Sequence, residues 1–425
     1  MLLFFAMVTS MKILHVSQGY WPALGGTELL IQRISEELHQ QFGDDVTVFT
    51  TDCANGEGFF LPSKRLPAGW SEVNGIPVRR FHVRHGATQI SRAARYAQAP
   101  FYRLRVPFNG YLRSVASGPL IPGLTTAIRD TPADVVAASS FPLLHMFAAE
   151  RGARQSGRPA VLHGGLHPED VWGYHRSMIY RAIRRVHYIA NTTYEADFVI
   201  SRGARPDHVH AIGVGVDVAQ FNHESQDEAK ARLGLDDGPV IGFIGQIAEH
   251  KGVGTLVEAM PRVWQAHPRA QLLVAGGRTA YYATVERLVR ELEPAQRARI
   301  HLRPDFANDE KGRLFSAIDL LAYPSGYESF GIAFLEAWVA GKPVIGCLRG
   351  AVPTVVRDGV DGLLVNFDDP VSLALAIELL LRSPQMRTEL GAAGREKVLA
   401  RYTWPHVARQ FREVYEQAVA ERTRP

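Results

Sequence analysis

Cysteine is nearly absent from this chain of 425 residues, which contains only Cys53 and Cys347. Two thiols cannot build a disulfide framework, and the sequence has no Cys-x-x-Cys pair or cysteine–histidine cluster. We therefore expect neither a disulfide scaffold nor a metal site. A reducing, cytoplasmic compartment fits this cysteine content best.

Long hydrophobic runs are also missing. No segment supplies 18 uninterrupted apolar residues, so the sequence predicts no transmembrane helix. The apolar start, residues 1–8, lacks a basic flank and is too short to span a bilayer. A strand begins more naturally at Met11, and we interpret residues 1–10 as an N-terminal extension, with a weak membrane anchor as the alternative.

Acidic residues are absent from segment 79–113, which contains eight arginines and six aromatic residues. In a helix, Arg92, Arg95 and Tyr96 would share one face, and Arg103 follows. Such a segment can lie on an anionic membrane, so peripheral binding at the inner face of the membrane is one hypothesis. The alternative is a solvated loop whose arginines pair with the rest of the protein. No recognition motif for nucleic acid accompanies the arginines.

Hydrophobic residues make up 46% of the chain and charged residues 21%, which is ordinary globular composition. Short apolar runs alternate with helical patterns such as 28–40 and 143–155, and this alternation predicts parallel sheets covered by helices. Residues 56–75, rich in glycine and proline, are predicted to form a loop. The predicted strands are 12–17, 45–51, 134–138, 160–163 and 187–190, then 240–245, 271–275, 299–302, 319–323 and 344–347.

The two strand series predict an α/β protein with two Rossmann-like, doubly wound domains. The polar stretch 216–237 separates the series, so we place an N-terminal domain at 11–215 and a C-terminal domain at 216–402. A last helical segment, 403–425, has no strand of its own to cover. We expect it to pack back on the first domain.

The glycine pair Gly25-Gly26 follows the first predicted strand and opens a helix. Ligands of open α/β sheets bind where strands end and helices begin. Glycine lets backbone N–H groups approach a phosphate or a sugar closely, although a simple tight turn is the alternative. The pair is part of neither a G-x-G-x-x-G nor a G-x-x-x-x-G-K-[ST] motif.

A lysine and two glutamates form the stronger motifs. Lys251 lies between the first strand and first helix of the second domain, where a mobile positive charge suits a diphosphate. The alternative is a solvated lysine at a helix start, which the helix dipole disfavours. Glu328 and Glu336 lie eight residues apart, one before a predicted helix and one within it. The helix start between them favours an anion, and the carboxylates suit hydroxyl groups. The alternative for Glu336 is a satisfied carboxylate on a partly buried helix.

In this order, the glycine pair, the Lys251 loop and the Glu328–Glu336 segment resemble glycosyltransferase family 4, whose members have the GT-B fold. The likeness continues through segments 341–346 and 358–365. Segment 213–217 resembles the family's junction between domains. The resemblance covers residues 11–402, closely in the second domain, whereas residues 56–120 match no pattern.

The resemblance implies two domains facing across a cleft, and retaining transfer of a sugar from a nucleotide diphosphate sugar without an essential metal or other cofactor. It places Glu336 on the ribose hydroxyls, Lys251 on the diphosphate, and Glu328 near the donor sugar as a catalytic candidate. It also assigns Gly25 and Gly26 to donor binding. Amides near the phosphate or sugar would come from Ser329, Phe330 and Gly331.

One position departs from the family pattern. Many members have an arginine five residues before the lysine, and this chain has Gln246 there. Glutamine can donate a hydrogen bond to the diphosphate but brings no charge. Arg278 or Arg303 are the candidates for supplying the missing positive charge.

His163 ends a predicted strand where the family often places an active-site histidine, so it is our second catalytic candidate. Its imidazole could hydrogen-bond the transferred sugar or the acceptor. A lone histidine at a strand end is more often structural, and His167 and His175 compete for the same role.

We therefore expect a retaining glycosyltransferase that moves a hexose-type sugar from UDP or GDP to a glycan or lipid-linked acceptor in cell-surface polysaccharide or glycolipid synthesis. The alternatives are a sugar phosphorylase or epimerase on the same architecture and a non-catalytic nucleotide-sugar-binding protein.

Overall fold

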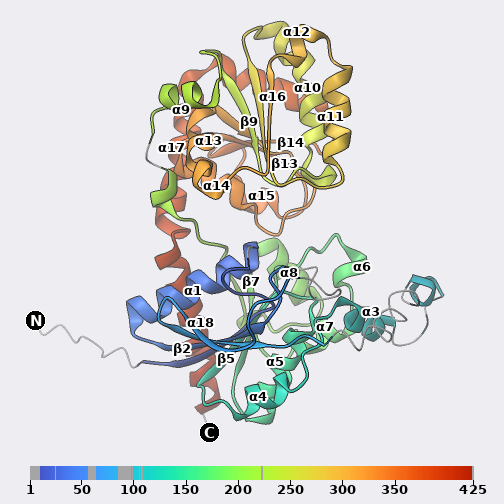
Figure 1. Ribbon diagram of the computed structural model, residues 1–425, viewed down its shortest axis with the longest axis vertical. Helices are drawn as coiled ribbons and strands as arrows, with labels where there is room; N and C mark the ends of the chain where they lie inside the picture. Colours follow the sequence, from blue (N-terminus) through green and yellow to red (C-terminus); the bar gives the residue numbers. More distant parts are fainter. Residues whose placement is uncertain are drawn as a thin grey trace, which may run out of the picture. The chain divides into compact units, whose positions relative to one another are not determined.

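The computed structural model describes residues 10–23, 25–55, 64–84, 97, 99–104, 106, 109–221 and 224–423 (Figure 1). The chain divides into two compact units. The first comprises Met1–Gly213 with Trp404–Pro425, and the second comprises Val214–Thr403. The expected boundaries, after residues 215 and 402, lie within two residues of these divisions.

An eight-stranded sheet forms the centre of the first unit, in the order β3-β4-β2-β1-β5-β6-β7-β8. Its neighbouring strands are parallel, except that β3 is antiparallel to β4. The strands are β1 (Lys12–Val16), β2 (Asp45–Thr51), β3 (Gly69–Val73), β4 (Ile76–Phe81), β5 (Val135–Ser139), β6 (Ala160–His163), β7 (His187–Ala190) and β8 (Val209–Ala211).

Helices lie between most of the parallel strands, because a parallel pair needs a long crossover connection. The helices of the first unit are α1 (Gly26–Phe42), α3 (Asn109–Ser117), α4 (Leu124–Asp130), α5 (Leu144–Gln155), α6 (Val171–Tyr174), α7 (Ser177–Ile183), α8 (Thr193–Ser201), the 3₁₀ turn η2 (Pro206–His208) and α18 (Trp404–Thr423).

The five predicted strands of this unit are confirmed, but three more were missed. β3 lies inside the segment 56–75 that we predicted to be a loop, and that part of the prediction is wrong. β3 is an edge strand with four of its five residues exposed, so it has no apolar run to reveal it. β4 is buried only at alternate positions, and β8 has three residues.

The second unit has a six-stranded parallel sheet in the order β11-β10-β9-β12-β13-β14. β9 and β10 are buried along their whole length, which explains their continuous apolar sequences. The sixth strand was not predicted. The strands are β9 (Val240–Ile244), β10 (Gln271–Gly276), β11 (Ile300–Pro304), β12 (Leu320–Ala322), β13 (Val344–Cys347) and β14 (Gly362–Val365).

In the second unit two helical elements precede β9 and the others follow strands. The helical elements are η3 (Val218–Phe221), α9 (Gln226–Leu233), η4 (Glu249–Lys251), α10 (Val253–Ala266), α11 (Tyr282–Glu291), α12 (Pro294–Arg297), η5 (Asn308–Glu310), α13 (Lys311–Ala317), α14 (Ile332–Val339), α15 (Val352–Val355), α16 (Pro370–Arg382) and α17 (Pro384–Arg401).

Helix α18 packs against the first unit, as predicted. Phe411 and Tyr415 are buried four residues apart on one face of the helix, and the Tyr415 hydroxyl lies 3.1 Å from His15 Nε2 on β1. Arg412 Nε donates to Asp44 Oδ2 at 2.9 Å beside them. Among the described residues, none of the helices combines the length and apolar character needed to cross a membrane.

Candidate functional site

The Lys251 loop and the segment before α14 converge at the carboxyl end of the second sheet. Lys251 ends the short turn η4, which follows β9, and its Nζ lies 2.6 Å from Glu328 Oε1. The same Nζ donates to the Tyr327 carbonyl at 3.3 Å. The two charged side chains are 14% and 9% exposed. Two motifs 77 residues apart in the sequence therefore meet as one ion pair.

Glu336 forms a second ion pair nearby on the same segment. It lies one turn into α14, and its Oε1 accepts a hydrogen bond of 2.8 Å from Lys311 Nζ, at the start of α13. Burial raises the pKa of Glu336, and the ammonium group of Lys311 lowers it in part. Sequence reasoning missed Lys311. The available signal was a lysine at a helix start, where the helix dipole disfavours a cation.

The start of α14 presents backbone amides between the two glutamates. Gly331 is its N-cap residue, with φ of 95°, and a Cβ there would lie 2.6 Å from the Phe334 ring. Glycine is thus required both by the left-handed backbone and by the space. No side chain among the described residues caps the first amides of the helix. Phe330 is buried against Tyr402, and Ser329 is half-buried.

The structure also shows where Gln246 lies, and where the two arginines lie that could supply the positive charge it lacks. Gln246 is exposed, two residues after the end of β9. Arg278 borders this loop, because residues Ile247 and Arg278 pair as an isolated parallel bridge, and its guanidinium forms an ion pair with Asp305. Arg303 instead donates to the Leu233 carbonyl at 2.7 Å. Arg278 is therefore the better candidate for supplementing Gln246.

A pocket of about 360 Å³ opens beside the Lys251 loop. Its wall combines aromatic rings with three carboxylates, from Glu249, Glu258 and Asp368. Carboxylates repel phosphate, so the pocket suits hydroxyl groups or a cation better than a diphosphate. Its lining residues are Glu249, His250, Gly254, Thr255, Glu258, Tyr281, Tyr327, Phe367 and Asp368.

The glycine pair of the first unit is exposed and opens α1 as predicted. The Glu28 carboxylate folds back over Gly25, where it would overlap any Cβ. Gln18 Nε2 holds this carboxylate with a hydrogen bond of 2.9 Å. The helix start therefore already has a carboxylate beside it, within the same unit.

His163, at the end of β6, has both ring nitrogens in hydrogen bonds. Nδ1 lies 2.9 Å from Ser139 Oγ, and Nε2 lies 2.7 Å from Asn191 Oδ1. Burial lowers the pKa of His163 to about 4, so the ring is neutral at neutral pH. These contacts favour the structural alternative that we kept for this residue.

The two competing histidines have their own contacts. His175 Nε2 donates to the Pro168 carbonyl at 2.9 Å. The ring of His167 lies against the ring of Tyr174, with centroids 5.6 Å apart.

Glu195 is a second residue that sequence reasoning missed. It is fully buried on α8 and accepts hydrogen bonds from the Tyr188 hydroxyl at 2.6 Å, the Asn191 amide at 2.8 Å and the Leu166 amide at 2.9 Å. Burial raises the pKa of Glu195 to about 7. With His163, it forms a buried polar network at the carboxyl ends of β6 and β7.

Two family models match the chain, and together they span both units. The model described as Glycosyltransferase Family 4 matches residues 24–220, and the model described as Glycosyl transferases group 1 matches residues 225–397. The chain belongs to glycosyltransferase family 4. The resemblance inferred from the sequence motifs is thus confirmed.

Curated relatives match parts of the chain. The D-inositol 3-phosphate glycosyltransferase of Salinispora tropica is 35% identical over 253 residues, which are 56% of this chain and 52% of the relative. The alpha-maltose-1-phosphate synthase of Mycolicibacterium smegmatis is 32% identical over 228 residues, or 51% of this chain and 58% of the relative. The chain spans about half the length of the curated relatives it matches.

Solved structures match nearly the whole chain. HepE of Anabaena in complex with UDP-glucose has a TM-score of 0.68 at 19% identity, covering 96% of this chain and 100% of the other. Sucrose-phosphate synthase of Thermosynechococcus elongatus has a TM-score of 0.71 at 20% identity, with the same coverage. At these identities the likeness shows the fold, and the predicted GT-B class is confirmed.

Proposed function

We propose that the chain is a retaining glycosyltransferase that moves a hexose-type sugar from UDP or GDP to a hydroxyl group of a glycan or lipid-linked acceptor. Its proposed role is in cell-surface polysaccharide or glycolipid synthesis. The observation that carries the proposal is the pair of lysine–glutamate contacts around the start of α14, Lys251 with Glu328 and Lys311 with Glu336. Solved relatives of the same fold in complex with UDP and UDP-glucose support a nucleotide-sugar donor.

Lys251 and the start of α14 are the proposed diphosphate site. A diphosphate carries more negative charge than one carboxylate, so it can compete with Glu328 for the Lys251 ammonium group. The uncapped amides of α14 add donors that point toward an anion. Once Lys251 turns to the phosphate oxygens, the Glu328 carboxylate is released to accept a hydrogen bond from the donor sugar.

Glu336 is the proposed ribose site. An ionised carboxylate offers both oxygens as strong acceptors for the two ribose hydroxyls, and burial works against ionisation of this residue. Lys311 opposes that effect at 2.8 Å. We therefore assign Lys311 as a positioning residue, which acts on the nucleotide through Glu336.

The chemistry follows from where charge develops. When the bond between the sugar and the phosphate oxygen breaks, the electron pair stays on the diphosphate and the sugar gains oxocarbenium character. Lys251 and the α14 amides would stabilise the diphosphate. The acceptor hydroxyl attacks the same face and passes its proton to the departing phosphate, which retains the configuration. Because these cationic and dipolar groups can serve the leaving group, we propose no essential metal for the transfer.

His163 has a positioning role in this proposal. Its two hydrogen bonds join the ends of β5 and β7, through Ser139 and Asn191 respectively. We therefore place direct contact with the donor on Glu328 rather than on this histidine.

Donor binding and donor hydrolysis test the proposal. Purified protein is heated with UDP, GDP, ADP and their sugars, and a ligand at 100 times its Kd stabilises the folded state by about 2.7 kcal/mol. We expect one nucleotide to raise the melting temperature and its sugar to be hydrolysed slowly. Binding without hydrolysis or transfer would favour the non-catalytic alternative, and no binding by any nucleotide would overturn the donor site.

Segment 79–113 is the proposed acceptor-side surface. In the structure, some of its arginines are turned to the protein, and its exposed residues include several aromatic rings. Arg80 and Arg113 are buried, and Arg79 stacks on Phe81, so these three arginines face the protein. Exposed apolar rings and one leucine accompany Arg103 instead. They are Phe101, Tyr102, Leu104 and Tyr111. Arg92, Arg95 and Tyr96 lie outside the described residues.

We propose that this aromatic surface contacts an anionic membrane beside a lipid-linked acceptor. Co-sedimentation with anionic vesicles should decrease with salt and fall at least about fivefold in Arg103→Glu, because one basic residue near the surface contributes about 1 kcal/mol and the new carboxylate is repelled. Arg129→Glu, an exposed change on α4, is the matched control and should bind like wild type. If the wild type does not bind anionic vesicles at low salt, a soluble acceptor is the better proposal.

A further inference from the structure

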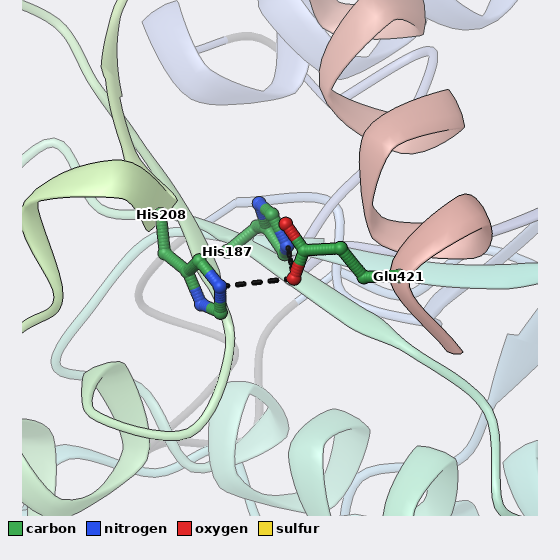
Figure 2. Close-up of side chains that lie close together, drawn as sticks. All are labelled: His187, His208 and Glu421. Atoms are coloured by element: carbon green, nitrogen blue, oxygen red, sulfur yellow. Dashed lines mark hydrogen bonds and ion pairs between the residues drawn. The ribbon is translucent and has the colours of Figure 1, made fainter. Parts of the chain in front are cut away.

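Two histidines and a glutamate from three separate segments meet at the edge of the first sheet. His187 begins β7, His208 ends the turn η2, and Glu421 lies in the last turn of α18 (Figure 2). In Figure 2 both imidazole rings direct a nitrogen toward the same carboxylate oxygen. The group belongs to the first unit alone and has no part in the proposed donor site.

The separations of the three ligand atoms match those around a small metal ion. His187 Nε2 lies 3.3 Å and His208 Nε2 lies 3.0 Å from Glu421 Oε2. A tetrahedral zinc site with bonds of about 2.0–2.1 Å holds its ligand atoms about 3.3 Å apart. All three atoms lie within 4.8 Å of one another. A small rearrangement would therefore bring them around one ion.

The surroundings also suit a metal site. The His187 and His208 side chains are 6% and 12% exposed, whereas Glu421 is 34% exposed, so the group has one open side for entry and for a water ligand. His187 Nδ1 lies 3.4 Å from His210 Nε2. A histidine ligand commonly donates its second N–H to a carboxylate, a carbonyl or water. Here a ring nitrogen of His210 would take that place, and Nε2 of His187 would stay free for the metal.

The ring arrangement indicates what must move when an ion binds. The His187 and His208 rings are stacked, with centroids 4.1 Å apart and planes 15° from parallel. A shared ion lies near the plane of each ring, so one ring must tilt. His208 is the better candidate, because it lies on a short 3₁₀ turn whereas His187 is fixed within a strand.

We propose that His187, His208 and Glu421 bind one divalent ion of the zinc class, with water in the fourth position, and that the ion fastens the end of α18 to the sheet. Imidazole and carboxylate ligands in this number suit Zn²⁺, Co²⁺ or Ni²⁺ rather than Mg²⁺ or Ca²⁺. We expected no metal site because no cluster of ligand residues occurs locally in the sequence. Here the ligands lie as far apart as 234 residues along the chain.

Titration calorimetry with ZnCl₂ tests the proposal. The full chain is prepared without a histidine tag and treated with chelator, and we expect one Zn²⁺ per chain, with no binding of Mg²⁺. Glu421→Gln and His208→Ala should each weaken Zn²⁺ binding by about tenfold or more. His82→Ala, which removes an imidazole paired with a single carboxylate of Asp52, is the matched control and should bind Zn²⁺ like wild type.

Two further measurements separate a built site from surface binding. Co²⁺ should give the intense visible absorption of a tetrahedral complex, and this band should vanish in Glu421→Gln while the circular dichroism of the fold is unchanged. Zn²⁺ should also raise the melting temperature of wild type but not of Glu421→Gln. Failure to bind one Zn²⁺, or equal affinity in wild type, Glu421→Gln and His208→Ala, would overturn the proposal.

Discussion

The carboxyl ends of the two sheets differ in how their polar side chains are paired. In the second unit, Lys251 with Glu328 and Lys311 with Glu336 form ion pairs that keep partial access to solvent. In the first unit, His163 and Glu195 form a buried network of hydrogen bonds, with the ring of His163 neutral at neutral pH. Ion pairs can exchange partners with an anionic ligand, whereas a fully paired buried network fixes the loops around it. The difference favours ligand exchange in the second unit and positioning in the first.

The largest expected effect is on stability, from a substitution that disrupts the buried network of the first unit. A methyl group at Gly164 would overlap the Tyr188 hydroxyl and lie 2.6 Å from Glu195 Oε1, so Gly164→Ala should lower the free energy of unfolding by at least about 3 kcal/mol. Gly26→Ala is the matched control, since a Cβ there meets no atom within 4 Å. Urea unfolding measures both variants. Equal stability of the two variants would mean that the loop after β6 is not held by packing.

The second prediction concerns the charge within the same network. The folded-state pKa of Glu195, about 7, lies above its ordinary value of 4.5, so the folded state binds the proton more tightly. This contribution to stability is fully present below about pH 4.5 and is lost as pH rises through 7.

Glu195→Gln removes that titration. The wild type loses its Glu195 contribution as the pH rises, whereas the variant has none to lose. The difference in free energy of unfolding between wild type and Glu195→Gln should therefore decrease by up to about 3 kcal/mol between pH 4.5 and 8. Glu291→Gln, on an exposed ion pair with Arg287, should show no such trend. A deficit for Glu195→Gln that is independent of pH would contradict the raised pKa.

The third prediction concerns the exchangeable pair of the second unit. Glu328→Gln removes the carboxylate that we place beside the donor sugar, and the substitution keeps the side chain's size. It should lower kcat by about 10- to 100-fold, with a smaller change in nucleotide affinity, because an interaction made chiefly in the transition state affects turnover. Steady-state kinetics and nucleotide titration separate the two effects. Near-normal turnover would give Glu328 a structural role.

Most of the fold could be predicted from the sequence, because buried parallel strands such as β9 and β10 appear as short apolar runs. Exposed or very short strands leave no such pattern, and this is why β3 and β8 were missed. The repeated strand–helix alternation also predicted the two units and the separate helix α18.

The candidate site was predictable where its residues share one motif. Glu328 and Glu336 flank a single helix start, and their order with Lys251 is typical of the family. Lys311 and Glu195 acquire their roles from neighbours brought by other elements, so their local sequence carries little signal. His163 was placed correctly at a strand end, but its two hydrogen-bond partners come from β5 and the loop after β7.

Nucleotide titration of the ion-pair variants tests the central claim most directly. The nucleoside diphosphate with the largest thermal shift is titrated into wild type, Glu336→Ala, Lys251→Ala and the control Glu291→Ala. A hydrogen bond to a charged group contributes about 1.5–3 kcal/mol. Glu336→Ala and Lys251→Ala should therefore bind the nucleotide roughly 10- to 150-fold more weakly than wild type, and Glu291→Ala should bind it like wild type. Unchanged affinity in both Glu336→Ala and Lys251→Ala would contradict the assignment of the donor site to these two ion pairs.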